Sequence, residues 1–280
     1  MYHLLSKFNY KFSEKYPELR DRDSLKAIDR ESLLFFAGNM HSQIGQDGIL
    51  AEIFRRLKIN YSYFVEFGGW DGIFMSNCRF LYEMGWSGCF IEGDIKKFNQ
   101  LEANYRDTKN IICLNEMVGF SRDDNLAALI KKYELDHDLI DFVSIDVDGI
   151  DLDIFENLGF SPKVILIEGG FSLSPLIEKK QDTALISQNV QQSLSVICAE
   201  GKRLGYTPVC FCQDTYFVRN DLVGNLFKNY EPIDLYTQAY NFLPVNKKKE
   251  LLNFRKNNTT IRQIEESNFG EFKLNPLSYL

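Results

Sequence analysis

The chain has 280 residues, with 32 Lys and Arg against 39 Asp and Glu, and therefore a formal net charge of −7. Such an acidic chain lacks the basic surface that nucleic-acid binding requires, so we expect no nucleic-acid partner. The apolar fraction of 45% is sufficient for a large folded core. No apolar run reaches the roughly 18 to 20 residues of a membrane span, and residues 1–7 lack the apolar stretch of a secretory signal. We therefore expect a soluble, cytoplasmic protein without a membrane partner.

The predicted elements begin with helices in residues 1–60. One helix is expected from Asp23 to Phe36 and another from Gln46, where apolar residues recur at spacings of three and four. After residue 60, short apolar runs alternate with helical stretches, which is typical of parallel strands joined by crossover helices. The expected strands are 63–67, 88–91, 111–114, 142–145, 164–167, 207–211 and 215–219. The expected helices between them are 77–84, 95–105, 124–133, 152–158 and 190–204.

The last two strands are separated by only three residues, too few for a crossover helix, so they should form an antiparallel hairpin at the sheet edge. The fold class is therefore α/β, with a doubly wound, Rossmann-like sheet of seven strands. We expect three parts: an N-terminal helical cap (1–60), the core (61–222) and a C-terminal helical extension (223–280). Within the core, residues 171–192 are too long for an ordinary connection. They predict either a substrate-binding loop with neutral polar side chains or a structural flap.

The first candidate site is the sequence VEFGGWDG at 65–72, an apolar strand that ends in an acid, two glycines and a second acid. The glycines allow backbone amides to approach a ligand, and Glu66 and Asp71 can accept hydrogen bonds from it. This is not the G-x-G-x-x-G loop that binds a pyrophosphate. The simpler alternative is a glycine-rich turn with an acidic helix cap.

A second acid, Glu92, ends the next strand about 20 residues further on, where an acid characteristically binds the two ribose hydroxyls of a nucleotide. A single acid at a strand end is weak evidence by itself. Its spacing from Glu66 strengthens it, because the ends of adjacent parallel strands face one ligand.

Together, EFGGWDG at 66–72, GWSGCFIE at 85–92 and SIDVDGID at 144–151 resemble the class I S-adenosylmethionine-dependent methyltransferases. Within that superfamily the sequence is similar to the FkbM-like branch, many of whose members O-methylate sugars or polyketides. The resemblance covers roughly residues 42–222. It implies that S-adenosylmethionine is the cofactor and that the last strand of the sheet is antiparallel.

The resemblance also implies the positions of the cofactor. Glu66, Gly68 and Asp71 would surround its methionine part, Glu92 its ribose, and residues 115–118 its adenine. The full set of implied cofactor-binding residues is Glu66, Gly68, Gly69, Asp71, Asn77, Glu92, Asn115, Glu116 and Asp146.

The third candidate site has four acids in eight residues, from Asp146 to Asp153, directly after an apolar strand. The spacing does not fit an EF-hand. Glu168 ends the next strand and should lie beside Asp146 and Asp148, and three carboxylates suit Mg²⁺ or Mn²⁺. Some sugar O-methyltransferases of the superfamily use such a metal to hold and acidify the acceptor hydroxyl. The alternative is that the later acids of the run cap a helix and that Asp146 faces the sulfonium of the cofactor.

A hydroxyl nucleophile also needs a group that takes its proton. The candidates are the metal, a carboxylate such as Asp146, and His41, which lies in the stretch before the core that folds toward the active site in the resembling family. His137 reads as a surface residue. The expected catalytic residues are thus His41, Asp146 and Asp148.

We therefore expect an S-adenosylmethionine-dependent O-methyltransferase that acts on a hydroxyl of a carbohydrate or glycosylated metabolite. One alternative is a nicotinamide-dependent oxidoreductase, which the missing phosphate loop disfavours. The other is a non-catalytic binding subunit with the same fold, against which the intact acids count. The sequence leaves the oligomeric state open, and a homo-oligomer is compatible with it.

Overall fold

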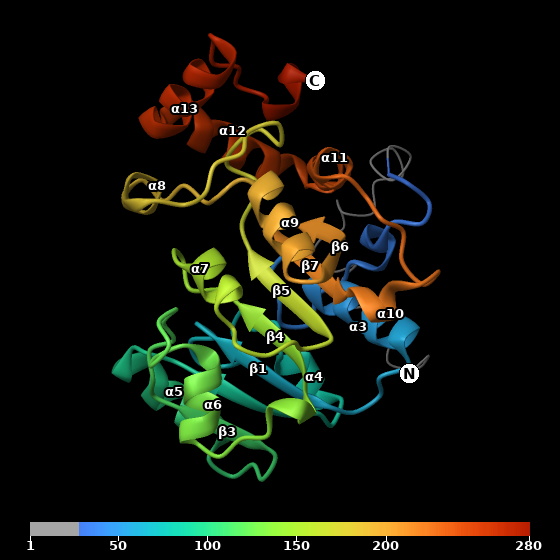
Figure 1. Ribbon diagram of the computed structural model, residues 1–280, viewed down its shortest axis with the longest axis vertical. Helices are drawn as coiled ribbons and strands as arrows, with labels where there is room; N and C mark the ends of the chain where they lie inside the picture. The colour runs from blue at the N-terminus through green and yellow to red at the C-terminus, as the bar shows by residue number, and fades with distance from the viewer. Residues whose placement is uncertain (1–27) are drawn as a thin grey trace.

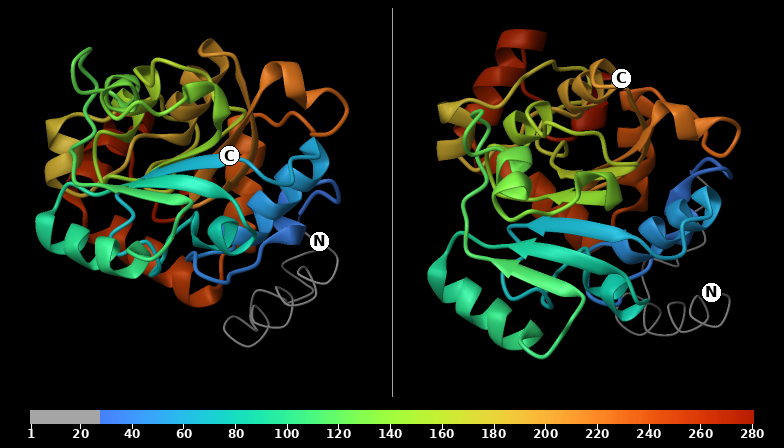
Figure 2. Two further views of the ribbon diagram at one scale, coloured as in Figure 1. Left: turned by 90° about the horizontal axis from the view of Figure 1, so that it is seen from below. Right: turned by 60° about the horizontal axis from the view of Figure 1, so that its bottom comes forward.

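The computed structural model describes residues 28–280, which form one seven-stranded sheet with helices on both faces (Figures 1 and 2). The strand order is β3-β2-β1-β4-β5-β7-β6. The strands are β1 (Tyr63–Phe67), β2 (Ser87–Ile91), β3 (Ile111–Leu114), β4 (Ile140–Ile145), β5 (Val164–Glu168), β6 (Tyr206–Cys212) and β7 (Asp214–Arg219). The first five are parallel, and β7 is antiparallel to both of its neighbours. The predicted fold class and the antiparallel hairpin are confirmed, with β6 at the edge and β7 inside the sheet.

The strands form where the sequence has apolar, β-branched and aromatic runs. Every residue of β4 is buried, as expected for a central parallel strand covered on both faces. Alternate side chains enter two separate cores: Phe64 and Phe142 contribute to one, and Val65 and Val143 to the other. The sheet thus has no solvent-exposed face at its centre, and its functional groups must lie at the strand ends.

The crossover helices cover the two faces in the order that right-handed connections require. On one face lie α4 (Arg79–Glu83) and α5 (Ile95–Tyr105), and on the other α6 (Leu126–Lys132) and α7 (Asp151–Glu156). The N-cap residue of α5 is Asp94, whose carboxylate accepts hydrogen bonds from two backbone amides of the first turn. The helices α3 (Gln46–Leu57) and α9 (Leu194–Arg203) complete the cover.

The helix expected from Asp23 to Phe36 is not observed in its described part. Residues 23–27, like the rest of residues 1–27 of the predicted N-terminal cap, lie outside the described residues. Beyond them only a short 3₁₀ helix, η2 (Leu33–Phe36), is present. The side chains of Asp29 and Ser32 accept hydrogen bonds from backbone amides two residues ahead, and this local bonding competes with an α-helix.

Residues 223–280, where the sequence predicts a helical extension, continue from α10 (Asn220–Val223) into α11 (Pro232–Phe242), α12 (Val245–Asn257), α13 (Thr259–Phe269) and η4 (Pro276–Tyr279). The helix α11 packs on α9 and β6. The next two helices lie beyond the carboxyl end of β5, together with the short helix α8 (Thr183–Ser187) (Figure 1). Among the described residues, no helix has both the length and the apolar character needed to cross a membrane.

A buried ion pair connects this extension to the core. The Arg255 guanidinium donates to both carboxylate oxygens of Glu265, at 2.8 and 2.7 Å, and both side chains are fully buried. Arg255 also donates to the carbonyl oxygen of Ser172 at 2.6 Å, while Glu265 accepts from the amide of Ser174 at 3.2 Å. The pair therefore fixes the start of the 171–192 segment against α12 and α13.

We expect Arg255→Met to lower the free energy of unfolding by about 3 to 5 kcal/mol, because Glu265 would remain as a buried charge without its partner. Urea unfolding followed by circular dichroism measures this loss. Arg262→Met, on the exposed side of α13, is the control and should change stability by less than about 0.5 kcal/mol. Equal effects of the two substitutions would contradict the role given to the pair.

Candidate functional site

The carboxyl ends of the central strands meet at one edge of the sheet. The pairing aligns Phe67 with Ile91 and with Ile145, and Ile145 with Ile167. The residues that follow each strand are therefore neighbours. On the other side of β5, Glu168 pairs with Asp214, the first residue of the antiparallel strand β7. Acids from three strands are thus brought to one place.

The structure brings together the three carboxylates that the sequence predicts as metal ligands. Asp146, Asp148 and Glu168 each offer an oxygen within 4.8 Å of the others. Asp146 and Glu168 are half-buried and Asp148 is exposed. Asp148 and Glu168 line a small cavity of about 80 Å³, so the cluster is accessible from one side.

These carboxylates repel one another in surroundings that solvate them poorly. Burial raises the pKa of Asp146 well above its usual range, and the charges of Asp214 and Asp151 raise it further. Burial also raises the pKa of Glu168 to about 10, with repulsion from Asp146 as the next cause. The pKa of Asp214 rises to about 7, again mainly through burial. A cation bound among the carboxylates would offset this electrostatic repulsion.

Two further features shape the cluster. Asp151 accepts hydrogen bonds from the amides of Val147 and Gly149, at 2.8 and 2.9 Å, so its carboxylate holds the loop after β4 in place. These amides precede α7, and the N-cap residue of that helix, Ile150, makes no side-chain cap, so the bonds differ from the helix capping that was the alternative for the later acids. In that loop Asp148 has a φ of 56°, which is a left-handed backbone conformation.

Two neutral amides contact the acids, and of these only Gln46 lies outside the segment that the sequence predicts as a substrate-binding loop. Gln191 donates to Glu168 at 2.8 Å, and Gln46 donates to Asp214 at 2.8 Å. Asp214 itself was also missed. The hairpin was predicted, but only the register of β7 on β5 places Asp214 opposite Glu168, and the sequence pattern does not reveal that register.

The glycine after β1 joins this cluster to the predicted cofactor side. Gly68 has a φ of 77°, and a Cβ there would lie 1.8 Å from the carbonyl oxygen of Asp146. Only glycine permits so close an approach. The neighbouring Gly69 lies against Glu66, where a Cβ would be 3.3 Å from Cγ. The loops after β1 and β4 are therefore in direct contact.

The two acids of the VEFGGWDG sequence are engaged by their own loop. Glu66 is buried and accepts hydrogen bonds from the Ser76 hydroxyl and from the amides of Asn77 and Cys78, at 2.7, 2.9 and 3.1 Å. Asp71 accepts from two amides of the following turn. The Asn77 side chain donates to the Ser144 hydroxyl at the end of β4. In this structure these side chains shape the loop, and their contact with a cofactor stays a prediction.

Glu92 is buried, at 6% exposure, and its carboxylate is only partly used by the protein's own hydrogen bonds. One carboxylate oxygen accepts from the Trp70 amide at 3.1 Å and the other from the Asp94 amide at 2.8 Å. A carboxylate accepts about four hydrogen bonds, so two positions are unused. Asn115 donates to the backbone carbonyl of Glu92 and orients the strand end.

The residues predicted to lie against adenine are partly suited to it. Met117 is 74% exposed, and its sulfur lies so close to Gly93 that a Cβ there would be 2.0 Å away. An exposed thioether beside the acid Glu92 offers an apolar face next to hydrogen-bond acceptors, which fits a nucleoside. Glu116 instead pairs with Lys132 and Tyr133 at the surface.

His41 is not placed in the cavity of the acids. Its Nε2 lies 3.1 Å from a carboxylate oxygen of Glu83. It lines a separate cavity of about 290 Å³ together with Phe74, Met75 and Lys247. Its role as the base stays a prediction, although the position argues against it.

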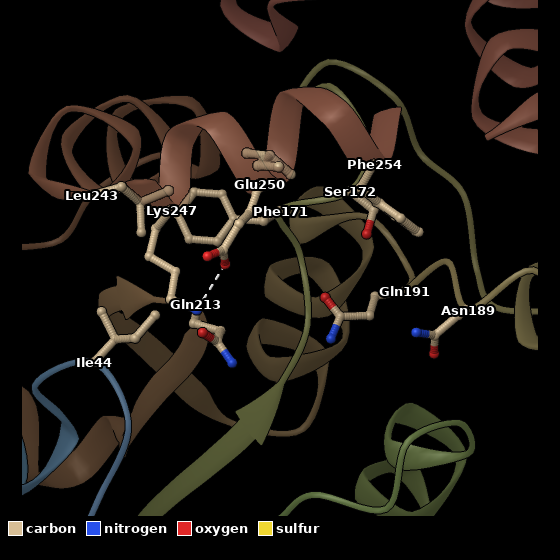
Figure 3. A pocket seen from close by; sticks show the side chains of 11 residues that line it. Ile44, Phe171, Ser172, Asn189, Gln191, Gln213, Leu243, Lys247, Glu250 and Phe254 are labelled. Atoms are coloured by element: carbon tan, nitrogen blue, oxygen red, sulfur yellow. Dashed lines mark hydrogen bonds and ion pairs between the residues drawn. The ribbon is translucent and has the colours of Figure 1, made fainter. Parts of the chain in front are cut away.

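A large cavity of about 390 Å³ lies between α12 and the 171–192 segment (Figure 3). It shares Asn189 and Gln191 with the small cavity at the acids, and Ile44 and Lys247 with the cavity of His41. The contribution of α12 was not predicted, because it depends on contacts between distant parts of the chain. Its lining residues are Ile44, Phe171, Ser172, Asn189, Gln191, Gln213, Leu243, Lys247, Glu250, Leu251 and Phe254.

No protein-family model and no curated protein matches the sequence. Among solved structures, the chain is similar to a putative sarcosine dimethylglycine methyltransferase from Galdieria sulphuraria, at 17% identity and a TM-score of 0.40, over 80% of each chain. It is also similar to M. capricolum TrmK in complex with S-adenosyl-homocysteine, at 13% identity and a TM-score of 0.38, over 80% of this chain and 94% of that chain. A third is a SAM-dependent methyltransferase from Aquifex aeolicus, at 11% identity and a TM-score of 0.31, over 76% and 96%.

The contact between the loops after β1 and β4 can be tested with two glycines that have nearly the same φ. We expect Gly68→Ala to destabilise the protein more than Gly270→Ala, which has a φ of 76° and no atom within 4 Å of the added Cβ. The control should lose only the conformational preference of glycine, about 1 kcal/mol. Gly68→Ala must in addition move the Asp146 carbonyl. Thermal unfolding measures both, and equal losses would contradict the close approach.

Proposed function

We propose that this protein is an S-adenosylmethionine-dependent O-methyltransferase that acts on a hydroxyl of a carbohydrate or glycosylated metabolite with the help of Mg²⁺ or Mn²⁺. The observation that carries the proposal is the convergence of Asp146, Asp148 and Glu168 beyond β4 and β5. Through Gly68 this cluster touches the loop that, by sequence resemblance, faces the cofactor. A methyl donor and an acceptor hydroxyl could therefore meet at one edge of the sheet.

Residues on the β1 and β2 side fit the cofactor, which supplies an activated methyl group when bound. Glu92 would accept hydrogen bonds from the ribose hydroxyls with its unused lone pairs. The exposed side chain of Met117 would cover one face of the adenine. Glu66 would act indirectly, because its hydrogen bonds to residues 76–78 hold the loop in shape.

The acid cluster fits a divalent cation by its donor chemistry. Carboxylate oxygens are the ligands that Mg²⁺ and Mn²⁺ prefer, and three of them lie within reach of a common point. Gln181 lines the same cavity, and its buried amide oxygen has no hydrogen-bond partner within residues 28–280. A bound divalent cation lowers the pKa of an acceptor hydroxyl.

The chain's own residues would then hold the acceptor oxygen beside the methyl donor. Direct methyl transfer requires an in-line approach over roughly 3 Å, so positioning supplies much of the rate. Asp146 is the residue of the cluster nearest to the β1 loop, since its carbonyl contacts Gly68. We therefore assign activation of the hydroxyl to the acid cluster and not to His41, which lines another cavity.

Cofactor binding can be measured without knowing the acceptor. Calorimetry should show that S-adenosylhomocysteine binds, and Glu92→Ala should weaken it by about 1.5 to 3 kcal/mol, the value of hydrogen bonds to a charged group. Glu102→Ala, an exposed acid on α5, should leave the affinity unchanged. Binding of NAD with equal affinity, or an unchanged affinity in Glu92→Ala, would contradict the cofactor assignment.

Metal binding is likewise measurable directly. Titration with Mn²⁺, followed by electron paramagnetic resonance of the free ion, should show one site that EDTA empties. Asp148→Asn should weaken this site at least tenfold, because it removes a charged ligand, and should retain S-adenosylhomocysteine binding. Asp123→Asn, at an exposed position, and His41→Ala should both bind Mn²⁺ normally. If Mn²⁺ does not bind, or binds equally to Asp148→Asn, the acids serve only in capping and cofactor contact.

A further inference from the structure

The large cavity beneath α12 adjoins the small cavity at the acid cluster. Asn189 and Gln191 line both this cavity and the small one that contains Asp148 and Glu168. Gln191 also donates a hydrogen bond to Glu168 at 2.8 Å. A molecule that fills the large cavity can therefore extend a group past Gln191 to the proposed reaction site.

The lining combines neutral polar groups with apolar surface. Figure 3 shows the amides of Gln213, Gln191 and Asn189 in a row beneath α12. Each amide can both donate and accept, as a sugar hydroxyl does. Phe171 and Phe254 supply aromatic surface for the C–H face of a ring. Such a mixture is the usual composition of a small-molecule site, and its volume lies in the usual range.

The charges around the cavity favour an uncharged ligand. Among its described lining residues the one cation is Lys247, which is paired with Glu250 at 2.8 Å, and both belong to α12. The other charges at its inner end are the carboxylates of the acid cluster. Even with a divalent cation bound, three carboxylates leave this end with a net negative charge, which disfavours an anionic ligand, and Lys247 is ion-paired with Glu250.

We propose that the cavity between α12 and the 171–192 segment binds the acceptor, and that the acceptor is an uncharged sugar or glycoside. This inference rests on the proposed methyltransferase function and defines its acceptor site. Gln191 is a positioning residue at the junction, where its amide nitrogen binds Glu168 and its amide oxygen faces the cavity. The ring of the sugar packs on the aromatic residues, and one of its hydroxyls lies toward the acids.

The test uses saturation-transfer NMR with the full chain and a panel of neutral methyl glycosides and disaccharides. Each neutral sugar is compared with its uronate, which adds a negative charge. We expect neutral sugars to bind, and each uronate to bind more weakly than its neutral counterpart. If no sugar of the panel binds, or if the uronates bind more tightly, the inference is overturned.

Variants locate the binding. Gln213→Gly removes an amide and suits the backbone, because Gln213 has a φ of 64°. This variant and Phe254→Ala should each weaken sugar binding about tenfold, the usual effect of losing one good contact in a buried site. Gln263→Ala, exposed on α13, is the control and should bind as the unmodified chain does. Unchanged binding in both cavity variants would overturn the location.

The failure of this inference is distinguishable from the failure of the proposed function. S-adenosylhomocysteine binding is measured by calorimetry on the same samples and should be equal in all three variants, because none of them lies on the β1 and β2 side. Loss of sugar binding with intact cofactor binding places the effect in the cavity. Sugar binding without any S-adenosylhomocysteine binding would reject the methyltransferase and leave a sugar-binding protein.

Discussion

The alignment of β5 with β4 and β7 places like charges side by side, and the rest of the site accommodates this constraint. Glu168 of β5 pairs with Asp214 of β7. Asp146 directly follows Ile145 of β4, which pairs with Ile167 of β5. Carboxylates directly opposite one another destabilise a sheet. Two neighbouring side-chain amides donate hydrogen bonds to these acids: Gln46 of α3 to Asp214, and Gln191 to Glu168. Neutral amides lessen the repulsion but carry no charge of their own, so a proton or a cation must complete the balance.

The sequence predicted the strands and much of the acid cluster because both follow from local pattern. Buried parallel strands read as apolar runs, and residues directly after them must meet at one edge. Asp146, Asp148 and Glu168 could therefore be expected together. Asp214 could not, since its place depends on the register of an antiparallel strand. The turn at residues 28–32 was also missed, because side-chain hydrogen bonds there replace helical ones.

Glu66 illustrates a different limit of sequence reasoning. An acid at the end of a strand can face a ligand or bind the backbone of its own loop, and both uses place the same residue in the same position. Here the carboxylate accepts three hydrogen bonds from residues 76–78. Only the path of the loop distinguishes the two, and that path depends on glycine conformations and on contacts with β4.

The dependence of the 171–192 segment on Arg255 has an evolutionary consequence. Apart from Ile44, the residues that line the large cavity come from the second half of the chain, whereas the glycine loop and Glu92 come from its first half. If this cavity holds the acceptor as proposed, mutations in α12 would alter which molecule is recognised without disturbing the earlier strands. A lineage of such proteins could diversify its targets through one helix and keep its chemistry, provided that the buried Arg255 and Glu265 persist.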